Sequence, residues 1–249
     1  MGIQSIPEHE LARLREKAKE ITGSQFDYQS SYTELLSRRL NGEPLQYIEE
    51  YVPFYSIQIN VDQRCLIPRP ETEYMIEIIK NNIDTPKKIL DVGTGTGCIA
   101  LMMKKLFPES EVHAVDISDD ALSLAKENAE INNLEVNFYQ SDLLSNVETL
   151  DFDLIVANLP YIPTSTLSTL TKEVIDHEPL IALDGGEDGR LYIDKLLNDL
   201  KNIDSKELVL VLEVDTSHAE SLLSSFTDWE DVKLEKDLVE RDRYIVARK

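Results

Sequence analysis

The stretch 89–101, "ILDVGTGTGCIAL", decides the fold. It joins an apolar run typical of a strand to a glycine-rich turn and to the start of a helix. Glycines at positions 93, 95 and 97 allow the backbone to turn sharply and to approach a ligand, at which the following helix directs its N–H groups. A dinucleotide-binding turn would have its third glycine at position 98, where this chain has Cys98. We therefore predict a ligand site at this turn and disfavour nicotinamide dinucleotides as the ligand.

Strands and helices alternate on both sides of this turn. Seven runs have the character of strands: "KKILDVG", "EVHAVD", "VNFYQSD", "FDLIVAN", "ELVLVLEV", residues 232–234 and residues 244–247. Helices are expected at residues 97–107, 119–132, 190–200 and 218–226, the second of them capped by Ser118. This alternation predicts an α/β fold with a Rossmann-like, mostly parallel, doubly wound sheet of seven strands.

The residues before the α/β region have a different character. Between residues 8 and 40, apolar residues recur at helical spacing, which predicts short amphipathic helices. Residues 44–70 contain "YIEEYVPFYSIQINV" and "RCLIP", whose aromatic and β-branched residues are typical of a β-hairpin. The prolines of "PRPE" predict a rigid connector into a helix that starts near Glu71. We therefore expect a short helical N-terminal domain at 1–43, a β-hairpin linker at 44–70 and an α/β catalytic domain at 71–249.

The composition argues against several classes of protein. A formal net charge of −22 is the opposite of what phosphate contacts with nucleic acid require. Two cysteines, Cys65 and Cys98, are too few for a disulfide framework, and neither lies in a zinc-binding motif. The N-terminal residues do not resemble a signal peptide, and no run of 18 apolar residues occurs. We expect a cytoplasmic protein without a membrane partner.

The glycine turn resembles the first motif of class I S-adenosylmethionine-dependent methyltransferases. Asp116 ends the following strand, where a carboxylate can accept hydrogen bonds from both hydroxyls of a ribose. Asp142 ends the third strand, and the resemblance places it at the adenine edge, with Leu143 packed on the ring. The resemblance implies S-adenosyl-L-methionine as cofactor, S-adenosyl-L-homocysteine as product, and no metal. The cofactor-binding residues that we expect are Gly93, Thr94, Gly95, Thr96, Gly97, Asp116, Ile117, Asp142, Leu143 and Asn158.

The residues "NLPY" at 158–161 follow the fourth strand and face the same edge of the sheet. Methyl transfer from a sulfonium is an in-line displacement, but the lone pair of an amide or aromatic amine is delocalised. The Asn158 side-chain oxygen and the Leu159 carbonyl can accept both N–H hydrogens of such a group and favour a more nucleophilic geometry. Pro160 stiffens the loop, and Tyr161 offers a face for stacking. We predict Asn158 and Tyr161 as catalytic residues, and all four residues as substrate-binding.

Several separated stretches resemble the HemK-type protein-(glutamine-N5) methyltransferases (PrmC), which modify peptide chain release factors. They are "RRLNGEPLQYI" at 38–48, "LIPRPETE" at 66–73, "NLPYIP" at 158–163, "EPLIALDGGEDG" at 178–189 and "KDLVERDRYIVA" at 236–247. The resemblance covers residues 38–249 and implies that the substrate is the side-chain amide of the glutamine in the Gly-Gly-Gln loop of a release factor. It also implies that residues 184–189 shape the rim of the site, and that Pro70 and Glu71 border the cofactor.

The chain departs from the pattern of this family at several positions. Leu159 stands where the family usually has proline, although the backbone carbonyl is retained. Asp215 and Glu240 stand where glycine is usual, which predicts altered turns at the edge of the sheet. The region before Arg38 is shorter than the usual helical domain, which bears on how the partner is recognised.

Two other functions are compatible with parts of the sequence. "NLPY" is also the spelling found in rRNA adenine dimethylases, so an N6-adenine methyltransferase acting on rRNA or DNA is the main alternative. That enzyme should have a basic groove, which the acidic composition disfavours. The second alternative is a binding protein that keeps the fold but not the reaction. We expect a monomer whose partners are release factors, without direct contact to nucleic acid.

Overall fold

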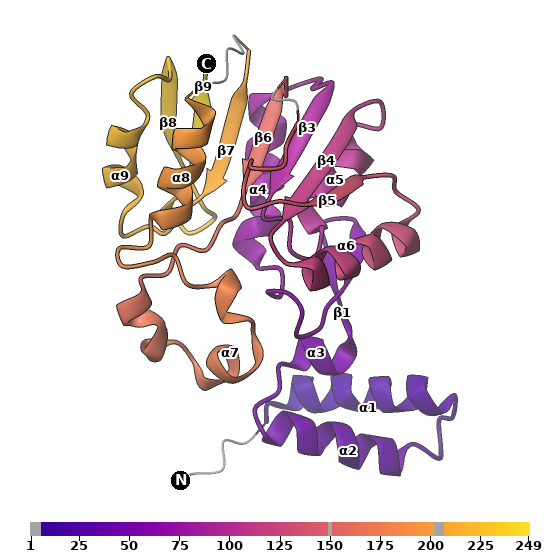
Figure 1. The fold of residues 1–249 in the computed structure, drawn as a ribbon. Coiled ribbons are helices and arrows are strands. Elements are labelled where there is room, and N and C mark those ends of the chain that lie inside the picture. The colour runs from indigo at the N-terminus through magenta and orange to yellow at the C-terminus, as the bar shows by residue number, and fades with distance from the viewer. Residues whose placement is uncertain (1–5, 149–150, 202–206) are drawn as a thin grey trace.

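A seven-stranded sheet forms the centre of the molecule (Figure 1). The computed structural model describes residues 6–148, 151–201 and 207–249. The strands are β3 (Lys88–Val92), β4 (Glu111–Asp116), β5 (Asn137–Gln140), β6 (Leu154–Ala157), β7 (Val209–Glu213), β8 (Asp231–Lys236) and β9 (Asp242–Arg248). Their order is β5-β4-β3-β6-β7-β9-β8, and β9 is antiparallel to both of its neighbours. The predicted α/β class and the mostly parallel seven-stranded sheet are confirmed.

Helices cover both faces of this sheet. One face packs on α4 (Pro70–Asn82), α5 (Cys98–Leu106) and α6 (Asp119–Asn132), and the other on α8 (Leu191–Leu200) and α9 (Ala219–Leu222). Successive strand residues alternate between the two cores: Ile89 lies in the first, and Leu90 in the second. Because both faces are covered, the central strands are almost continuously apolar.

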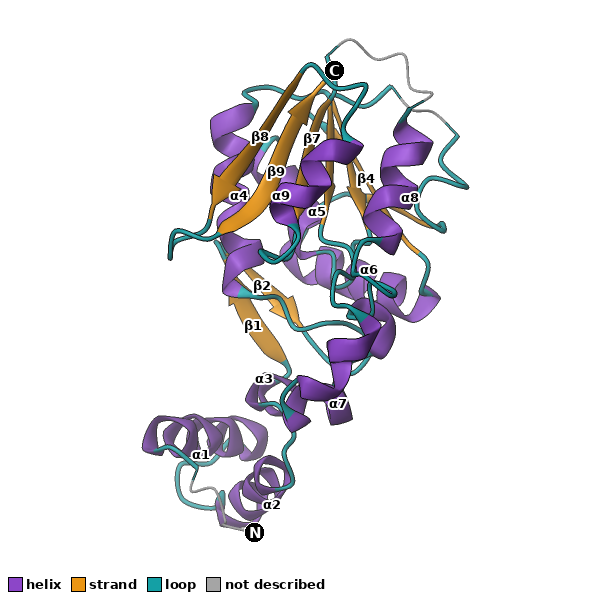
Figure 2. Ribbon diagram, turned by 90° about the vertical axis from the view of Figure 1, so that its left-hand side faces the viewer, coloured by secondary structure: helices purple, strands orange, loops and turns teal. Residues whose placement is uncertain are grey.

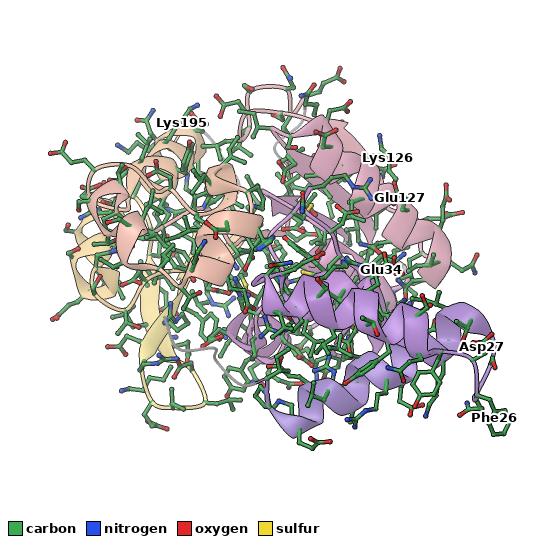
Figure 3. All side chains as sticks on the ribbon, turned by 90° about the horizontal axis from the view of Figure 1, so that it is seen from below. Phe26, Asp27, Glu34, Lys126, Glu127 and Lys195 are labelled. Atoms are coloured by element: carbon green, nitrogen blue, oxygen red, sulfur yellow. The ribbon has the colours of Figure 1, made fainter. Side chains whose placement is uncertain are left out.

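The N-terminal helices form a separate layer below the sheet (Figures 1 and 2). They are α1 (Glu8–Thr22), α2 (Gln29–Leu40) and the short α3 (Leu45–Glu49). A small core joins them, to which each helix contributes at least one buried side chain: Leu14, Ala18, Leu35, Leu45 and Ile48. Phe26, between α1 and α2, is 96% exposed and extends away from the molecule (Figure 3).

The linker differs in part from its prediction. Its hairpin consists of β1 (Tyr51–Phe54) and β2 (Ile57–Asn60), so residues 45–49 are helical and residues 65–68 form a loop, not a strand. The helix forms because Leu45 and Ile48 pack against α1 and α2. No strand in the described part of the chain pairs with this loop, and the backbone N–H of Ile67 donates to the Glu178 side chain instead. The hairpin packs on the first core through residues such as Phe54 and Ile59.

Other predicted elements agree with the structure to within a few residues. Helix α6 has the predicted bounds, and the hydroxyl of its N-cap Ser118 accepts from the Ala121 N–H. The helix expected at 218–226 is shorter and continues as a 3-10 turn, η3 (Leu223–Ser225). Besides α3, the elements η1 (Thr164–Thr169), α7 (Lys172–His177) and η2 (Leu180–Ala182) were not predicted. They lie in the long connection between β6 and α8, beside the N-terminal helices (Figure 1).

The two departures at usual glycine positions have different backbones. Glu240 has a φ of +64°, the left-handed region that favours glycine, whereas Asp215 has a negative φ and accepts from the Ser217 N–H. The boundaries at residues 43 and 70 stay a prediction. No helix among the described residues is long and apolar enough to cross a membrane.

Candidate active site

A pocket opens at the carboxyl edge of the parallel strands. Its lining comes from the turns after β3, β4, β5 and β6, together with the linker loop and residues 179–182. All the expected cofactor residues line it: Gly93, Thr94, Gly95, Thr96, Asp116, Ile117, Asp142, Leu143 and Asn158, with the exception of Gly97. The pocket lies where ligands of open α/β sheets bind.

The glycine turn brings the backbone against the pocket. Gly93, Gly95 and Gly97 have φ values of +73°, +53° and +81°, a region that side chains disfavour. A Cβ on Gly93 would lie 2.9 Å from Cδ2 of Leu159, and a Cβ on Gly97 3.1 Å from the Ala125 side chain. Gly97 therefore acts behind the pocket, where it allows α5 and α6 to pack closely.

Asp116 is hydrogen-bonded to the glycine turn that it faces. Its carboxylate accepts hydrogen bonds from the N–H groups of Gly95 and Ser118, both at 2.9 Å. Burial raises the pKa of Asp116, and these N–H groups oppose that shift. Because each carboxylate oxygen has two acceptor positions, capacity for ribose hydroxyls remains.

The part of the pocket that follows β5 is more exposed than the glycine turn. Asp142 forms an ion pair with Lys195 of α8, at 2.6 Å, and both side chains are 45% exposed. Figure 3 shows Lys195 at the periphery of the molecule. Leu143 is buried with a φ of +50°, and Ile117 is half exposed at the pocket wall. The Lys195 pair leaves the second oxygen of Asp142 for another hydrogen bond.

Asn158 is held in one orientation by α4. Its Nδ2 donates to the Thr72 hydroxyl at 2.9 Å, while none of the described residues donates to its Oδ1. Leu159 is buried, and its carbonyl likewise accepts no hydrogen bond from the described residues. Two acceptors thus remain available beside the glycine turn, because β3 and β6 are neighbouring parallel strands. From "PRPETE", Thr72 lines the pocket together with Pro68, whereas Pro70 and Glu71 do not.

Tyr161 is placed differently from the rest of the motif. It does not line the pocket; its hydroxyl donates to Oε1 of Glu213 at 3.1 Å, and its ring packs in the second core. Burial raises the pKa of both side chains. The structure therefore does not bring Tyr161 into position to stack on a group in the pocket.

The "DGGEDG" loop supports the loop that carries Asn158. Ile162 and Asp184 form a parallel bridge, and the Gly185 N–H donates to the Ile162 carbonyl at 2.8 Å. A Cβ on Gly185 would lie 2.7 Å from Cα of Tyr161. Gly185 is therefore needed for close backbone packing against the loop that carries Asn158.

Several site residues were missed by the sequence analysis. Glu213 ends the apolar strand β7 and so carries the same kind of signal that identified Asp116. Thr72 and Glu178 carry no comparable local signal. Glu178 is buried and accepts from the Arg69 guanidinium at 2.6 Å and from the Ile67 N–H at 3.1 Å. Glu178 thereby joins the long connection between β6 and α8 to the linker loop.

Comparison with known proteins indicates the class of protein to which this chain is similar. A family model described as "Methyltransferase small domain" matches residues 70–193. The Mtq2–Trm112 complex of E. cuniculi, described as responsible for methylation of the eRF1 translation termination factor, is similar with a TM-score of 0.54 and 22% identity. The match covers 75% of this chain and 99% of that chain, and at this identity it concerns the fold. Fold and site together define a class I S-adenosylmethionine-dependent methyltransferase.

Curated relatives narrow this class to one family. The release factor glutamine methyltransferase of Koribacter versatilis is 38% identical over 226 residues, which cover 90% of this chain and 81% of that protein. The enzyme of the same name from Thermodesulfovibrio yellowstonii is 36% identical over 222 residues, 86% of this chain and 80% of that protein. The chain belongs to the release factor glutamine methyltransferase family.

Proposed function

We propose that this protein transfers a methyl group from S-adenosyl-L-methionine to the side-chain amide nitrogen, N5, of the glutamine in the Gly-Gly-Gln loop of peptide chain release factors. S-Adenosyl-L-homocysteine is the second product. The observation that carries the proposal is the state of Asn158: its Nδ2 is bound to Thr72, so its Oδ1 is the group left to accept from an incoming amide. Family membership supplies the substrate class.

The pocket residues fit this cofactor. S-Adenosyl-L-methionine supplies an electrophilic methyl group on a positively charged sulfonium. The acidic side chains of Asp116 and Asp142 suit a cationic nucleoside, and the charge of Arg64 is offset by Asp62 and Glu127. We assign the turn at 93–97 to the methionine part, Asp116 to the ribose, and Asp142 with Leu143 to the adenine. We assign Asn158, which also lines the pocket, to both the cofactor and the acceptor.

The acceptor loop holds the amide by its two hydrogens. Oδ1 of Asn158 and the Leu159 carbonyl each accept one N–H, which fixes the nitrogen and favours localisation of its lone pair. No strong base is required beforehand, because the proton can leave from the cationic product. Replacement of the family's proline by Leu159 retains the carbonyl, and the leucine side chain packs on Gly93.

We assign Pro160 to stiffening the loop, and Tyr161 to supporting it through Glu213 in place of direct stacking. The described residues contain no group of three or more His, Cys, Asp or Glu side chains arranged around a metal. We propose a monomeric cytoplasmic enzyme that acts without a metal and contacts the release factor, not nucleic acid. The net charge of −22 favours this partner over an RNA or DNA duplex, and so favours the amide over adenine.

An Asn158→Ala variant tests the proposal. We expect it to bind S-adenosyl-L-methionine with an affinity close to that of the wild type, while methylation of a purified release factor falls at least about 100-fold. The readouts are a calorimetric titration with the cofactor and transfer of a labelled methyl group. Turnover close to the wild-type rate would show that Asn158 does not hold the amide.

A further inference from the structure

We propose that Thr72 and Glu213 are positioning residues that set the orientation of the Asn158 side-chain amide. Their effect is to keep Oδ1 of Asn158, not Nδ2, available to the substrate amide. This inference rests on the proposed function, in which Asn158 accepts a hydrogen bond from the acceptor glutamine.

The three side chains form a continuous chain of hydrogen bonds. Asn158 Nδ2 donates to Thr72 Oγ1 at 2.9 Å, and Thr72 Oγ1 donates to Glu213 Oε2 at 2.8 Å. The residues come from three elements: the loop after β6, the first turn of α4 and the end of β7. Strands β6 and β7 pair Ala157 with Leu212, so Asn158 and Glu213, the next residue of each segment, lie at the same level of the sheet.

The chemistry of the donors and acceptors gives this chain a direction. The Thr72 hydroxyl donates to Glu213 Oε2, so its single hydrogen is already used. The lone pairs of Thr72 then face Asn158, and only the NH₂ end of the Asn158 amide can satisfy them. The amide oxygen is consequently turned to the other side. Without this constraint, the two ends of an asparagine amide have nearly the same shape and can exchange by rotation.

Burial makes the constraint strong. Thr72 is 3% exposed and Glu213 is 1% exposed, so water does not replace a lost partner without cost. The second carboxylate oxygen of Glu213 is occupied by the Tyr161 hydroxyl. Burial raises the pKa of Glu213, and these two hydroxyl donors and the charge of Arg243 oppose that shift. Through Thr72 and Tyr161, Glu213 therefore connects the Asn158 side chain to the loop in which both Asn158 and Tyr161 lie.

A set of nearly isosteric variants separates orientation from packing. Thr72→Val keeps the shape but removes the hydroxyl, Thr72→Ser keeps the hydroxyl, and Glu213→Gln introduces a donor that can reverse the chain. Thr33→Val, on exposed α2, is the matched control, because its hydroxyl bonds only the Gln29 carbonyl within its own helix. For each variant, kcat for release factor methylation, the Kd of S-adenosyl-L-methionine and the thermal unfolding midpoint are measured.

We expect Thr72→Val and Glu213→Gln to lower kcat about 10-fold or more, with cofactor affinity unchanged within about twofold. Thr72→Ser should recover most of the lost rate, whereas Thr33→Val should match the wild type. A wild-type kcat in folded Thr72→Val, or equal losses in Thr72→Val and Thr72→Ser, would overturn the inference. Full activity of Asn158→Ala would instead overturn the proposed function, so the two failures are distinguishable.

Discussion

Gly189 lies against the carbonyl oxygen of Tyr161, so closely that a side chain at position 189 would collide with it. The same Cβ would lie 3.1 Å from the His218 ring and 3.2 Å from Pro163. Since Tyr161 belongs to the loop that carries Asn158, the last glycine of "DGGEDG" limits how that loop can be placed. The glycine-rich stretch thus supports the loop that carries Asn158.

Gly189→Ala is expected to displace the acceptor loop. Gly23 also has a positive φ, +61° against +77° for Gly189, but a Cβ there meets no atom within 4 Å. Gly23→Ala should therefore cost about 1 kcal/mol of backbone strain and keep full activity. Gly189→Ala should lose more stability and at least about 10-fold in kcat. Urea unfolding and methyl-transfer assays check both variants, and indistinguishable results would contradict the assigned role of Gly189.

Arg69 is expected to contribute far more stability than a surface arginine. Its partner Glu178 has a side chain that is only 2% exposed, so Arg69→Ala leaves a buried charge uncompensated and should cost about 3 kcal/mol. Arg15→Ala removes an exposed pair with Glu8 and should cost much less stability than Arg69→Ala.

Adding Glu178→Gln to Arg69→Ala removes the uncompensated charge and should restore part of the loss. Urea-induced unfolding gives the free energies of unfolding of the wild type, of Arg69→Ala, of Glu178→Gln and of the double variant. Failure of the double variant to recover any stability would mean that the buried charge is not the cause.

Asp116→Ala is expected to weaken cofactor binding without preventing folding. The change removes the two acceptors that hold the N–H groups of Gly95 and Ser118, as well as the proposed ribose contact. We expect the Kd of S-adenosyl-L-methionine to rise about 10-fold or more. Asp120→Ala, in the first turn of α6, is the control with unchanged affinity. Equal cofactor affinity of Asp116→Ala and the parent would refute the assignment of Asp116.

Asp91 is expected to make stability depend on pH. It is fully buried, which raises its pKa to about 7, against the opposing hydrogen bonds from Thr94 and Ala100. Its unfolded-state pKa is about 3.9, so the folded protein binds this proton more tightly. The resulting stabilisation is complete below about pH 4 and is lost as the pH rises through about 7.

Asp91→Asn lacks this titration. The unfolding free energy of the wild type, relative to that of the variant, should therefore fall by up to about 1.4 kcal/mol per pH unit across this window. Denaturant unfolding of both proteins without cofactor, at several pH values between about 4 and 8, gives the difference. Parallel pH profiles would show that Asp91 does not titrate in this range.

The parts of the fold that the sequence predicted depend on local patterns. Helix α6 was predicted with its bounds because both its periodicity and its cap, Ser118, lie within the segment itself. The loop at 65–68 was mistaken for a strand because its apolar residues are buried by packing. The backbone N–H of Ile67 is satisfied by Glu178, which lies 111 residues away in the sequence. Helix α7 has no buried residue and thus no apolar stripe to indicate it.

The same distinction applies to the site. The turn at 93–97 and Asn158 carry recognisable motifs, but the residues that orient Asn158 are remote: Thr72 and Glu213 are 141 residues apart. Tyr161 belongs to the motif, yet its direction depends on Glu213, which only the pairing of β6 with β7 brings near. The motifs predicted residues that line one pocket, whereas the hydrogen-bond partners of Asn158 and Tyr161 required the tertiary structure.

The most direct test of the central claim is to locate the transferred methyl group. The protein is incubated with methyl-labelled S-adenosyl-L-methionine and a purified release factor, and the product is digested and sequenced by mass spectrometry. The account predicts label on the glutamine of the Gly-Gly-Gln loop, and none when that glutamine is replaced by alanine. Label that persists in the alanine-substituted release factor, or that enters ribosomal RNA instead, would contradict it.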